Sequence, residues 1–161
     1  MDQNSLFTQL YQQYGAGIRK LCQGYLGDPA MAEDLVQETF ITVWNNLTEF
    51  RGEAKWSTWI YRIAVNTCLM YKRKDKKNML YQDVFADIPQ EQNELEQQVQ
   101  LLYKCISQLK EADRLIIMLT LEDKPYPEIA QITGFSEGNL RVKIHRIKKE
   151  LTEIFKRHGQ L

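Results

Sequence analysis

The sequence predicts an all-α protein made of two small helical domains that are joined by a flexible linker. Apolar residues recur at three- and four-residue spacings, and no stretch shows the strict alternation that is typical of strands. The eight glycines and four prolines gather at segment boundaries. One polar, acidic stretch has no apolar period and separates the two helical parts. We therefore expect no β-sheet.

The first domain is expected over residues 1–75. An apolar face begins at Leu6 and Leu10, and the glycines at 15 and 17 are expected to weaken that helix locally. The segment Gly27-Asp28-Pro29 predicts a stop and a new start, with Asp28 as the N-cap and Pro29 at the first helical position. The next helix has a broad core-facing stripe, formed by Leu35, Val36, Thr39, Phe40, Val43, Trp44 and Leu47.

A loop is expected at residues 50–55, followed by a helix to about Lys74. Ser57 or Thr58 is the expected N-cap of that helix. Its core stripe is predicted at Ile60, Ile63, Ala64, Thr67 and Tyr71. Residues 76–93 are the expected linker, since they carry Pro89 and many Gln, Asp and Glu residues.

The second domain is expected over residues 94–161, with helicity returning near Glu94. Apolar residues in the first part mark one helical face, formed by Leu95, Val99, Leu102, Ile106 and Leu109. A second helix is expected at about 113–122, and Asp123-Lys124-Pro125 ends it. Two further helices, joined by a turn at Gly134, complete the domain.

Residues 126–151 have the anatomy of a helix-turn-helix. Pro127 suits a helix start, Ala130 allows a close crossing, Gly134 suits a left-handed end, and Ser136 can cap the next helix. In the second helix, Leu140, Ile144, Ile147 and Leu151 face inward. The side chains left toward solvent suit base edges and phosphates: Glu137, Asn139, Arg141, Val142, His145, Arg146 and Lys149. An ordinary hairpin with a solvated charged face is the alternative, but the coincidence of these features favours DNA binding.

Charge is unevenly distributed along the chain. The 21 basic and 21 acidic residues cancel, which argues against a protein that binds nucleic acid by itself. However, seven basic and three acidic side chains follow Ser136, whereas six acidic and two basic side chains lie between Asp75 and Glu96. This asymmetry indicates a DNA-facing end tied to an acidic connector.

Several functional classes find no support in the sequence. The three cysteines are far apart and form no C-x-x-C pair, so we expect neither a disulfide framework nor a metal site. No signal peptide or membrane span is recognisable, which predicts a cytoplasmic protein. No Gly-rich phosphate loop, nucleophile motif or catalytic pair occurs. We expect no enzyme, no catalytic residue, no cofactor and no small-molecule substrate.

Two segments strongly resemble conserved region two of the extracytoplasmic-function sigma factors in the sigma-70 family. They are Ala32 to Trp44 and Phe50 to Asn66, and the similarity continues through Lys72-Arg73-Lys74. The segment from Tyr126 to Leu151 is similar to the region-four helix-turn-helix of the same family, in the family's order and separation. The resemblance implies a subunit that binds core RNA polymerase and promoter DNA and directs promoter-specific initiation.

The resemblance also assigns partners and a docking surface. Asp34, Gln37, Glu38 and Ile41 would bind the clamp helices of the largest polymerase subunit, and the flap of the second-largest subunit is a further contact. Asp34, Glu38 and Ile41 lie together opposite the core stripe, which suits a basic partner helix. A merely solvated acidic face is the alternative. An anti-sigma factor is a further partner that the resemblance implies.

The resemblance assigns recognition of the minus-ten promoter element to the helix after the loop. Trp59, Arg62, Asn66 and Arg73 form one exposed stripe, and Arg51, Lys55 and Trp56 lie at its N-terminal end. Aromatic rings and guanidinium groups stack on unpaired bases, and asparagine can hydrogen-bond a base edge. By resemblance, this surface would melt promoter DNA and hold a flipped base. The alternative is that Trp56 and Trp59 are core residues, which we expect for one of them.

Other functions remain as alternatives. A conventional helix-turn-helix regulator would bind duplex DNA on its own, usually as a dimer. The tryptophan-rich stripe has no evident purpose in such a protein. An RNA-binding adaptor would fit the single-strand stacking, but the order of the two motifs argues against it. The linker could follow the RNA-exit path or serve as a simple tether.

Overall fold

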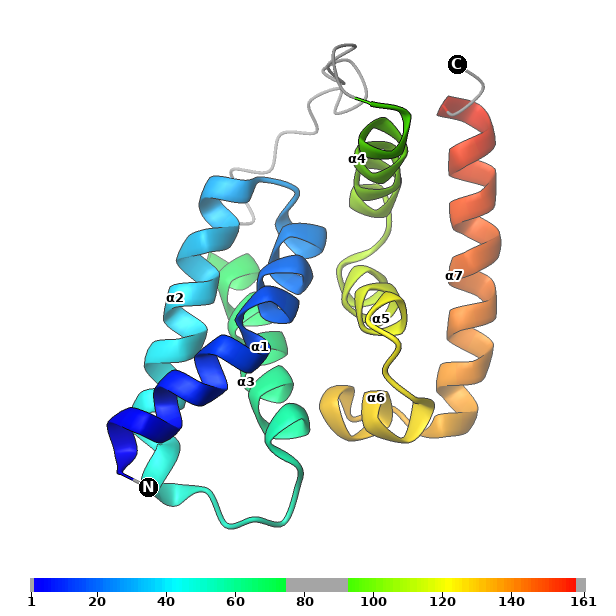
Figure 1. The fold of residues 1–161 in the computed structure, drawn as a ribbon. Coiled ribbons are helices and arrows are strands. Elements are labelled where there is room, and N and C mark those ends of the chain that lie inside the picture. Colours follow the sequence, from blue (N-terminus) through cyan, green and yellow to red (C-terminus); the bar gives the residue numbers. More distant parts are fainter. Residues whose placement is uncertain (1, 75–92, 159–161) are drawn as a thin grey trace.

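The computed structural model describes residues 2–74 and 93–158, and within these ranges the chain is helical without any strand. Figure 1 shows the helices of the N-terminal half beside those of the C-terminal half. The prediction of an all-α fold is confirmed. The helices are α1 (Gln3–Leu26), α2 (Pro29–Asn46), a short 3-10 helix (Leu47–Glu49), α3 (Trp56–Lys74), α4 (Glu94–Ser107), α5 (Glu111–Leu121), α6 (Tyr126–Thr133) and α7 (Glu137–His158).

Helices α1, α2 and α3 form the N-terminal half. Asp28 caps α2 by accepting a hydrogen bond from the Ala30 amide at 2.9 Å, and Pro29 is the first helical residue, as expected. Helix α1 continues without a break through residues 15–17, and the local weakening stays a prediction. At Gly17 a side chain would collide with the hydroxyl of Tyr61 on α3.

The start of α3 differs from the prediction. The helix begins at Trp56, so neither Ser57 nor Thr58 is its N-cap. The hydroxyl groups of both residues instead donate hydrogen bonds to Glu128 of α6, at 2.8 and 3.4 Å. A cap and a tertiary contact have the same sequence signature because each needs only a small side chain with a hydroxyl group.

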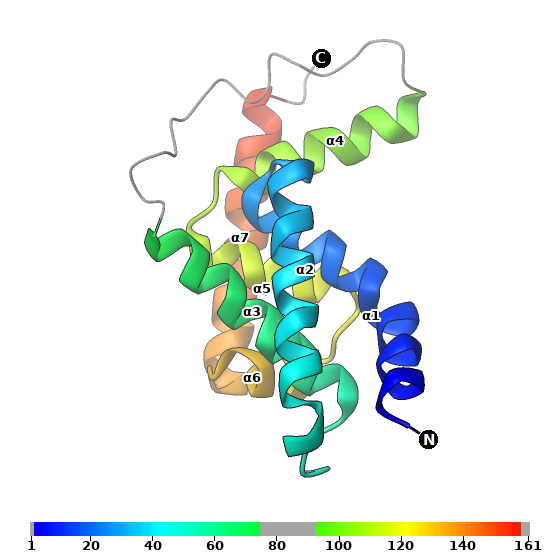
Figure 2. The ribbon, with the colours of Figure 1, turned by 90° about the vertical axis from the view of Figure 1, so that its left-hand side faces the viewer.

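Helices α4 to α7 form the C-terminal half. Gly134 ends α6 with a φ of 85°, and the Ser136 hydroxyl accepts a hydrogen bond from the Asn139 amide at 3.2 Å, as the sequence predicts. Leu140, Ile144 and Ile147 of α7 are buried. The expected apolar face of α4 is buried only in part, because Leu95 is 70% exposed. Figure 2 shows that the N-terminal end of α4 extends beyond the other helices.

The two halves pack against each other in one continuous apolar core. Helix α1 contacts α5, and α3 contacts α6. At the first contact Gly24 lies against Met118, where an added Cβ would collide with the Met118 side chain. The expected linker, residues 76–93, lies outside the described residues except for Asn93, whose side chain caps α4. Helix α7 lies at the edge farthest from the N-terminal half.

Candidate polymerase and promoter interfaces

One face of α2 is acidic and exposed. The predicted docking residues Asp34, Gln37, Glu38 and Ile41 are all exposed there, and Ile41 keeps 59% of its surface. The neighbouring Glu33 differs from this group because its carboxylate forms an ion pair with Arg19 at 2.8 Å. The structure therefore brings the predicted residues together on a surface that the core does not use.

The opposite side of α2 faces the core. Leu35, Val36, Thr39, Phe40 and Val43 are buried, as the predicted stripe requires. Trp44 is an exception to that prediction, because it is 36% exposed, and its ring meets that of Phe7 nearly at a right angle with centroids 5.3 Å apart. The first turns of α1 lie against the last turn of α2, where the Gln3 amide also donates to the Trp44 carbonyl at 3.4 Å.

Three aromatic rings gather where the loop at residues 50–55 enters α3. Phe50 stacks on Trp56 with ring centroids 3.7 Å apart, and Trp59 meets Trp56 edge-on at 5.6 Å. Both tryptophans are half-buried and pack against the core. Each tryptophan is therefore partly a core residue and partly exposed to solvent.

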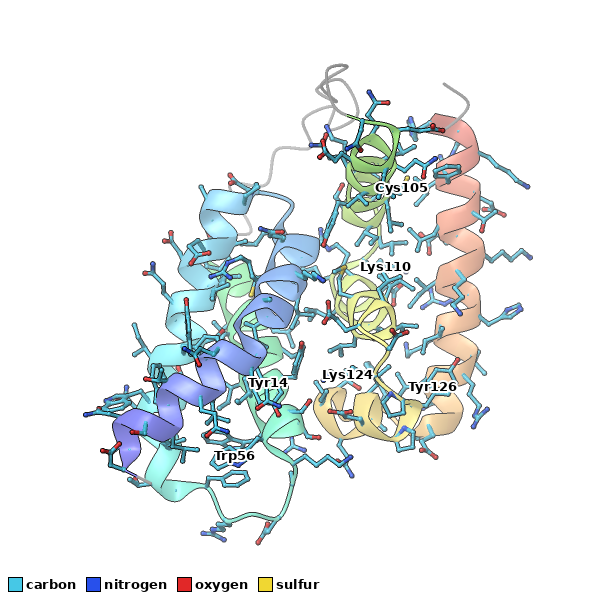
Figure 3. All side chains as sticks on the ribbon, viewed as in Figure 1. Tyr14, Trp56, Cys105, Lys110, Lys124 and Tyr126 are labelled. Carbon is cyan, nitrogen blue, oxygen red and sulfur yellow. The ribbon has the colours of Figure 1, made fainter. Side chains whose placement is uncertain are left out.

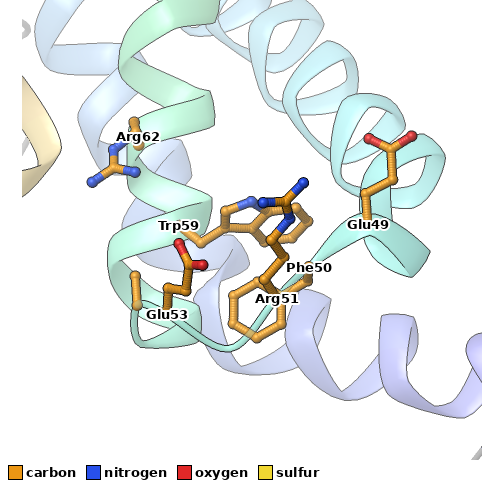
Figure 4. A pocket seen from close by; sticks show the side chains of 7 residues that line it. Glu49, Phe50, Arg51, Glu53, Trp59 and Arg62 are labelled. Carbon is orange, nitrogen blue, oxygen red and sulfur yellow. The ribbon is translucent and has the colours of Figure 1, made fainter.

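A small hollow of about 190 Å³ lies beside these rings. Glu49, Phe50, Arg51, Glu53, Ala54, Trp59 and Arg62 line it. Figure 4 shows the Arg51 guanidinium group and the Trp59 indole facing this space, with Glu53 between Trp59 and Arg62. Pockets for drug-sized ligands enclose about 300–1,000 Å³, so this hollow suits a single small flat group. Lys55 is exposed at the C-terminal end of the same loop.

Along α3, Arg62 and Asn66 of the predicted stripe are exposed, but Arg62 is already engaged. The Arg62 guanidinium donates two hydrogen bonds to the Gln131 carbonyl of α6, from Nη2 at 2.8 Å and from Nε at 3.1 Å. Asn66 is exposed one turn later. Arg73 lies in the last turn of α3, and the placement of its side chain is outside the description.

A polar cluster joins α3 to the turn before α6 and to α6 itself, and sequence reasoning missed it. The Lys124 ammonium donates to the Ser57 hydroxyl at 2.6 Å, and that hydroxyl donates to Glu128 at 2.8 Å. Lys124 also lies 4.0 Å from the ring centroid of Tyr61. Burial, together with the nearby carboxylates of Glu122 and Glu128, raises the pKa of Tyr61. No local pattern could have indicated these contacts, since the partners lie more than sixty residues apart in the sequence.

The predicted DNA face of α7 is exposed along the helix. Glu137, Asn139, Arg141, Val142, His145, Arg146 and Lys149 all lie on it, and Val142 is 70% exposed. The Arg141 guanidinium lies 5.3 Å from the ring centroid of Tyr126, which restricts the side chain before any partner binds.

Arg146 has a structural contact as well. Its Nη2 lies 3.3 Å from both carboxylate oxygens of Asp113, whose side chain is only 5% exposed at the start of α5. The guanidinium group therefore balances a nearly buried charge inside the C-terminal half. Sequence reasoning placed Arg146 among the DNA contacts and gave no sign of this pairing.

The described residues contain no group of His, Cys, Asp and Glu that could hold a metal ion. No helix in the described part of the chain is long and apolar enough to cross a membrane. Cys22, Cys68 and Cys105 are buried free thiols, and the sulfur atoms of Cys22 and Cys68 are 4.0 Å apart.

Comparison with known proteins identifies the family. The family model "Sigma-70 region 2" matches residues 10–78, and "Sigma-70, region 4" matches residues 99–151. The chain is 31% identical to the ECF RNA polymerase sigma-E factor of Haemophilus influenzae, over 89% of this chain and 84% of that protein. The chain belongs to the extracytoplasmic-function sigma factors of the sigma-70 family. As a sigma factor it directs transcription initiation by RNA polymerase.

Further relatives agree with this membership. The sigma factor is 28% identical to the ECF RNA polymerase sigma factor SigW of Bacillus subtilis, over 92% of this chain and 90% of that protein. Among solved structures, its fold resembles the sigma factor RpoE of Bartonella quintana in complex with the anti-sigma factor NepR, with a TM-score of 0.78, 22% identity and coverage of 93% and 96%. It also resembles CnrH in complex with the cytosolic domain of CnrY, with a TM-score of 0.73, 21% identity and coverage of 95% and 89%.

Proposed function

We propose that this sigma factor divides its work among three surfaces in two domains. Residues 1–75 form the domain that docks on the polymerase and recognises the minus-ten element. Residues 94–161 form the domain that recognises the minus-thirty-five element, and residues 76–93 connect the two. The observation that carries the proposal is that each surface lies on a different helix and presents exposed polar or charged side chains to solvent.

Polymerase docking uses the acidic face of α2. Asp34 and Glu38 provide carboxylates for a basic partner helix, and Ile41 provides an apolar contact between charged neighbours. The partner is the pair of clamp helices of the largest subunit, and the second domain contacts the flap of the second-largest subunit.

Minus-ten recognition uses α3 and the hollow beside it. Trp59 and Arg51 offer stacking surfaces on the hollow, and its size suits one nucleobase turned out of the duplex. Arg62 and Asn66 continue the surface along α3, toward Arg73. Trp56 and Lys55 complete it at the N-terminal end. A regulator that binds only duplex DNA has no use for such a hollow, so this feature favours the sigma factor over the conventional regulator.

Minus-thirty-five recognition uses the exposed face of α7. Glu137, Asn139 and Arg141 lie near the start of the helix and meet base edges, with Val142 and His145 beside them. Lys149 lies two turns farther along and reaches the phosphate backbone. Arg146 contributes to the same surface while it also holds Asp113.

An anti-sigma factor is a further proposed partner. The two solved structures described above are complexes with a second protein, and each superposes over almost the entire chain. We also propose that this sigma factor has no catalytic activity of its own and acts in the cytoplasm, where the polymerase is. It needs no cofactor.

The decisive experiment is reconstituted transcription. The purified chain and core polymerase are combined on genomic DNA, and the start sites are mapped. We expect new start sites that share two sequence elements, together with co-purification of the chain and the polymerase. Tight sequence-specific binding by the isolated chain, without co-purification, would instead establish the conventional regulator.

A further inference from the structure

Two arginines on the proposed DNA face of α7 are restrained in different ways. The Arg141 guanidinium group lies 5.3 Å from the ring centroid of Tyr126, which Figure 3 labels at the start of α6. A cation beside an aromatic ring keeps its positive charge. Arg146 instead meets a carboxylate, since its Nη2 lies 3.3 Å from both side-chain oxygens of Asp113. The charge of Arg146 is therefore balanced from within the protein, whereas that of Arg141 is not balanced by its ring contact.

The pair of Arg146 and Asp113 spans the surface of the C-terminal half. Asp113 lies in the first turn of α5, three residues after Lys110, which Figure 3 labels. The Asp113 side chain is only 5% exposed, whereas the Arg146 side chain is 47% exposed. The carboxylate thus lies beneath the guanidinium group and holds it from the protein side. Because little water reaches Asp113, solvent screens its charge weakly.

This pairing changes what Arg146 offers to DNA. A side chain that binds a phosphate must bring an uncancelled positive charge, because the contact is driven by the release of counterions from the DNA. The charges of Arg146 and Asp113 cancel, so the pair attracts a phosphate only weakly. Arg146 still keeps N–H donors, since a guanidinium group has five and the contacts with Asp113 use only Nη2. The result is a fixed set of donors that carries little net charge.

The position of Arg146 on α7 also favours a base edge. Arg146 follows Asn139 and Val142 at helical spacings of three and four residues, so the three side chains share one exposed stripe. A guanidinium group has donors only and fits best where a base presents acceptors only. In the major groove that base is guanine, which presents O6 and N7. Lys149 lies one turn beyond Arg146 and is exposed, so it suits the phosphate backbone instead.

We propose that Asp113 is a positioning residue for minus-thirty-five recognition, which holds Arg146 so that this arginine reads the edge of a guanine and does not bind a phosphate. The inference rests on the proposed function, since it takes α7 as the recognition helix. Asp113 itself makes no contact with DNA and acts only through Arg146. Because the guanidinium group is held before DNA binds, less side-chain freedom is lost in the complex. A nearly buried carboxylate on α5 thus determines part of the promoter specificity.

The test compares Asp113→Asn with Glu153→Gln, which removes the same charge from an exposed residue of α7. Promoter binding by each full chain with core polymerase is measured at two salt concentrations, on a library that carries every base at every minus-thirty-five position. We expect Asp113→Asn to lose about tenfold of the preference for guanine at one position, as loss of one arginine–guanine contact does. Its salt slope should steepen by up to about one unit, because Arg146 regains its full charge. Glu153→Gln should keep the guanine preference.

A second variant, Arg146→Lys, separates the geometry of the side chain from its charge. Its ammonium group still balances Asp113 but lacks the planar fork of donors, so the guanine preference should fall while the salt slope stays that of the wild type. Circular dichroism checks that each variant is folded. Retention of the guanine preference by a folded Asp113→Asn or Arg146→Lys variant would overturn the inference, as would equal weakening on every sequence. If the wild type shows no base preference at any minus-thirty-five position, the proposed function of α7 fails instead.

Discussion

Gly138 lies in the first turn of α7 with open space where its Cβ would be. It shares one helical face with Arg141, Val142 and His145, at spacings of three, four and seven residues. A glycine inside a helix costs about 1 kcal/mol relative to alanine. Neither a positive φ nor a neighbouring atom requires it here. We infer that the DNA backbone comes close to α7 at this residue.

The variant Gly138→Ala should therefore be more stable than the wild type but less active in transcription. We expect the free energy of unfolding to rise by up to about 1 kcal/mol, because alanine favours the helix. Transcription should fall, because the methyl group meets the DNA. The control is Gly15→Ala in α1, where the new methyl group makes ordinary contact with Tyr11 at 3.9 Å. Thermal unfolding and transcription are measured for both, and full activity of Gly138→Ala would show that DNA stays away from this turn.

We expect Val142 to make an apolar contact with a DNA base, although the rest of this face is mostly polar. A valine that is 70% exposed there suits the C5-methyl group of a thymine in the major groove. Replacing that thymine by uracil should weaken transcription about fourfold, the weight of one methyl group at about 0.8 kcal/mol. The Val142→Ala variant should respond equally to both templates. Equal sensitivity of the wild type and the variant to uracil would remove Val142 from base recognition.

Substitutions of Arg146 and Lys149 should differ in their effect on stability, although both residues are exposed cations on α7. Arg146→Ala leaves the nearly buried Asp113 carboxylate without its partner, which should cost about 1–3 kcal/mol of stability. Adding Asp113→Asn should recover most of that loss. Lys149→Ala should leave stability unchanged and lower the salt slope of promoter binding by about one unit. Denaturant unfolding and salt titrations distinguish the two, and equal stability of both single variants would contradict the structural role of Arg146.

Helix α2 has one face that packs in the core and one that is proposed to dock on the polymerase. Its buried stripe holds the N-terminal half together, while Asp34 and Glu38 project away from that stripe. Changes on the acidic face should thus leave the fold intact. The same division explains why helical periodicity separates Asp34 and Glu38 from the core stripe in the sequence, whereas the docking role came from the resemblance.

Reversing Asp34 and Glu38 to lysine should abolish assembly with core polymerase and leave the melting temperature nearly unchanged. The matched control reverses Glu94 and Glu96, which are exposed in the first turn of α4 and give the same change of charge. Assembly is measured by co-migration with core polymerase, and folding by circular dichroism. Normal assembly of the α2 variant would exclude the docking role, whereas loss of its helical signal would indicate a structural one.

The whole molecule should unfold as one unit because its core is continuous across both halves. All three tryptophans lie in the N-terminal half, at positions 44, 56 and 59, so their fluorescence reports that half alone. Circular dichroism reports both halves. We expect the two probes to give the same urea midpoint in the wild type and different midpoints in Lys124→Glu, which loses the contact of Lys124 with Ser57. Separate midpoints in the wild type would show that the halves are independent.

The sequence by itself determined the helices, their main caps and the exposed faces. Asp28, Pro29, Gly134 and Ser136 each act within a few residues of chain, so their effect is visible without any tertiary information. The faces of α2 and α7 follow from the period of the α-helix in the same way. The order of the two motifs then indicated the family.

Only the tertiary structure decided which side chains are already engaged. Ser57 bonds to Glu128 of α6 instead of capping α3, Arg62 is held by the Gln131 carbonyl, and Arg146 pairs with Asp113. The start of α4 stays exposed although its sequence has an apolar face. The physical reason is the same in each case: these contacts join residues from different helices, and a local pattern states what a side chain can do but not which distant partner comes within its reach.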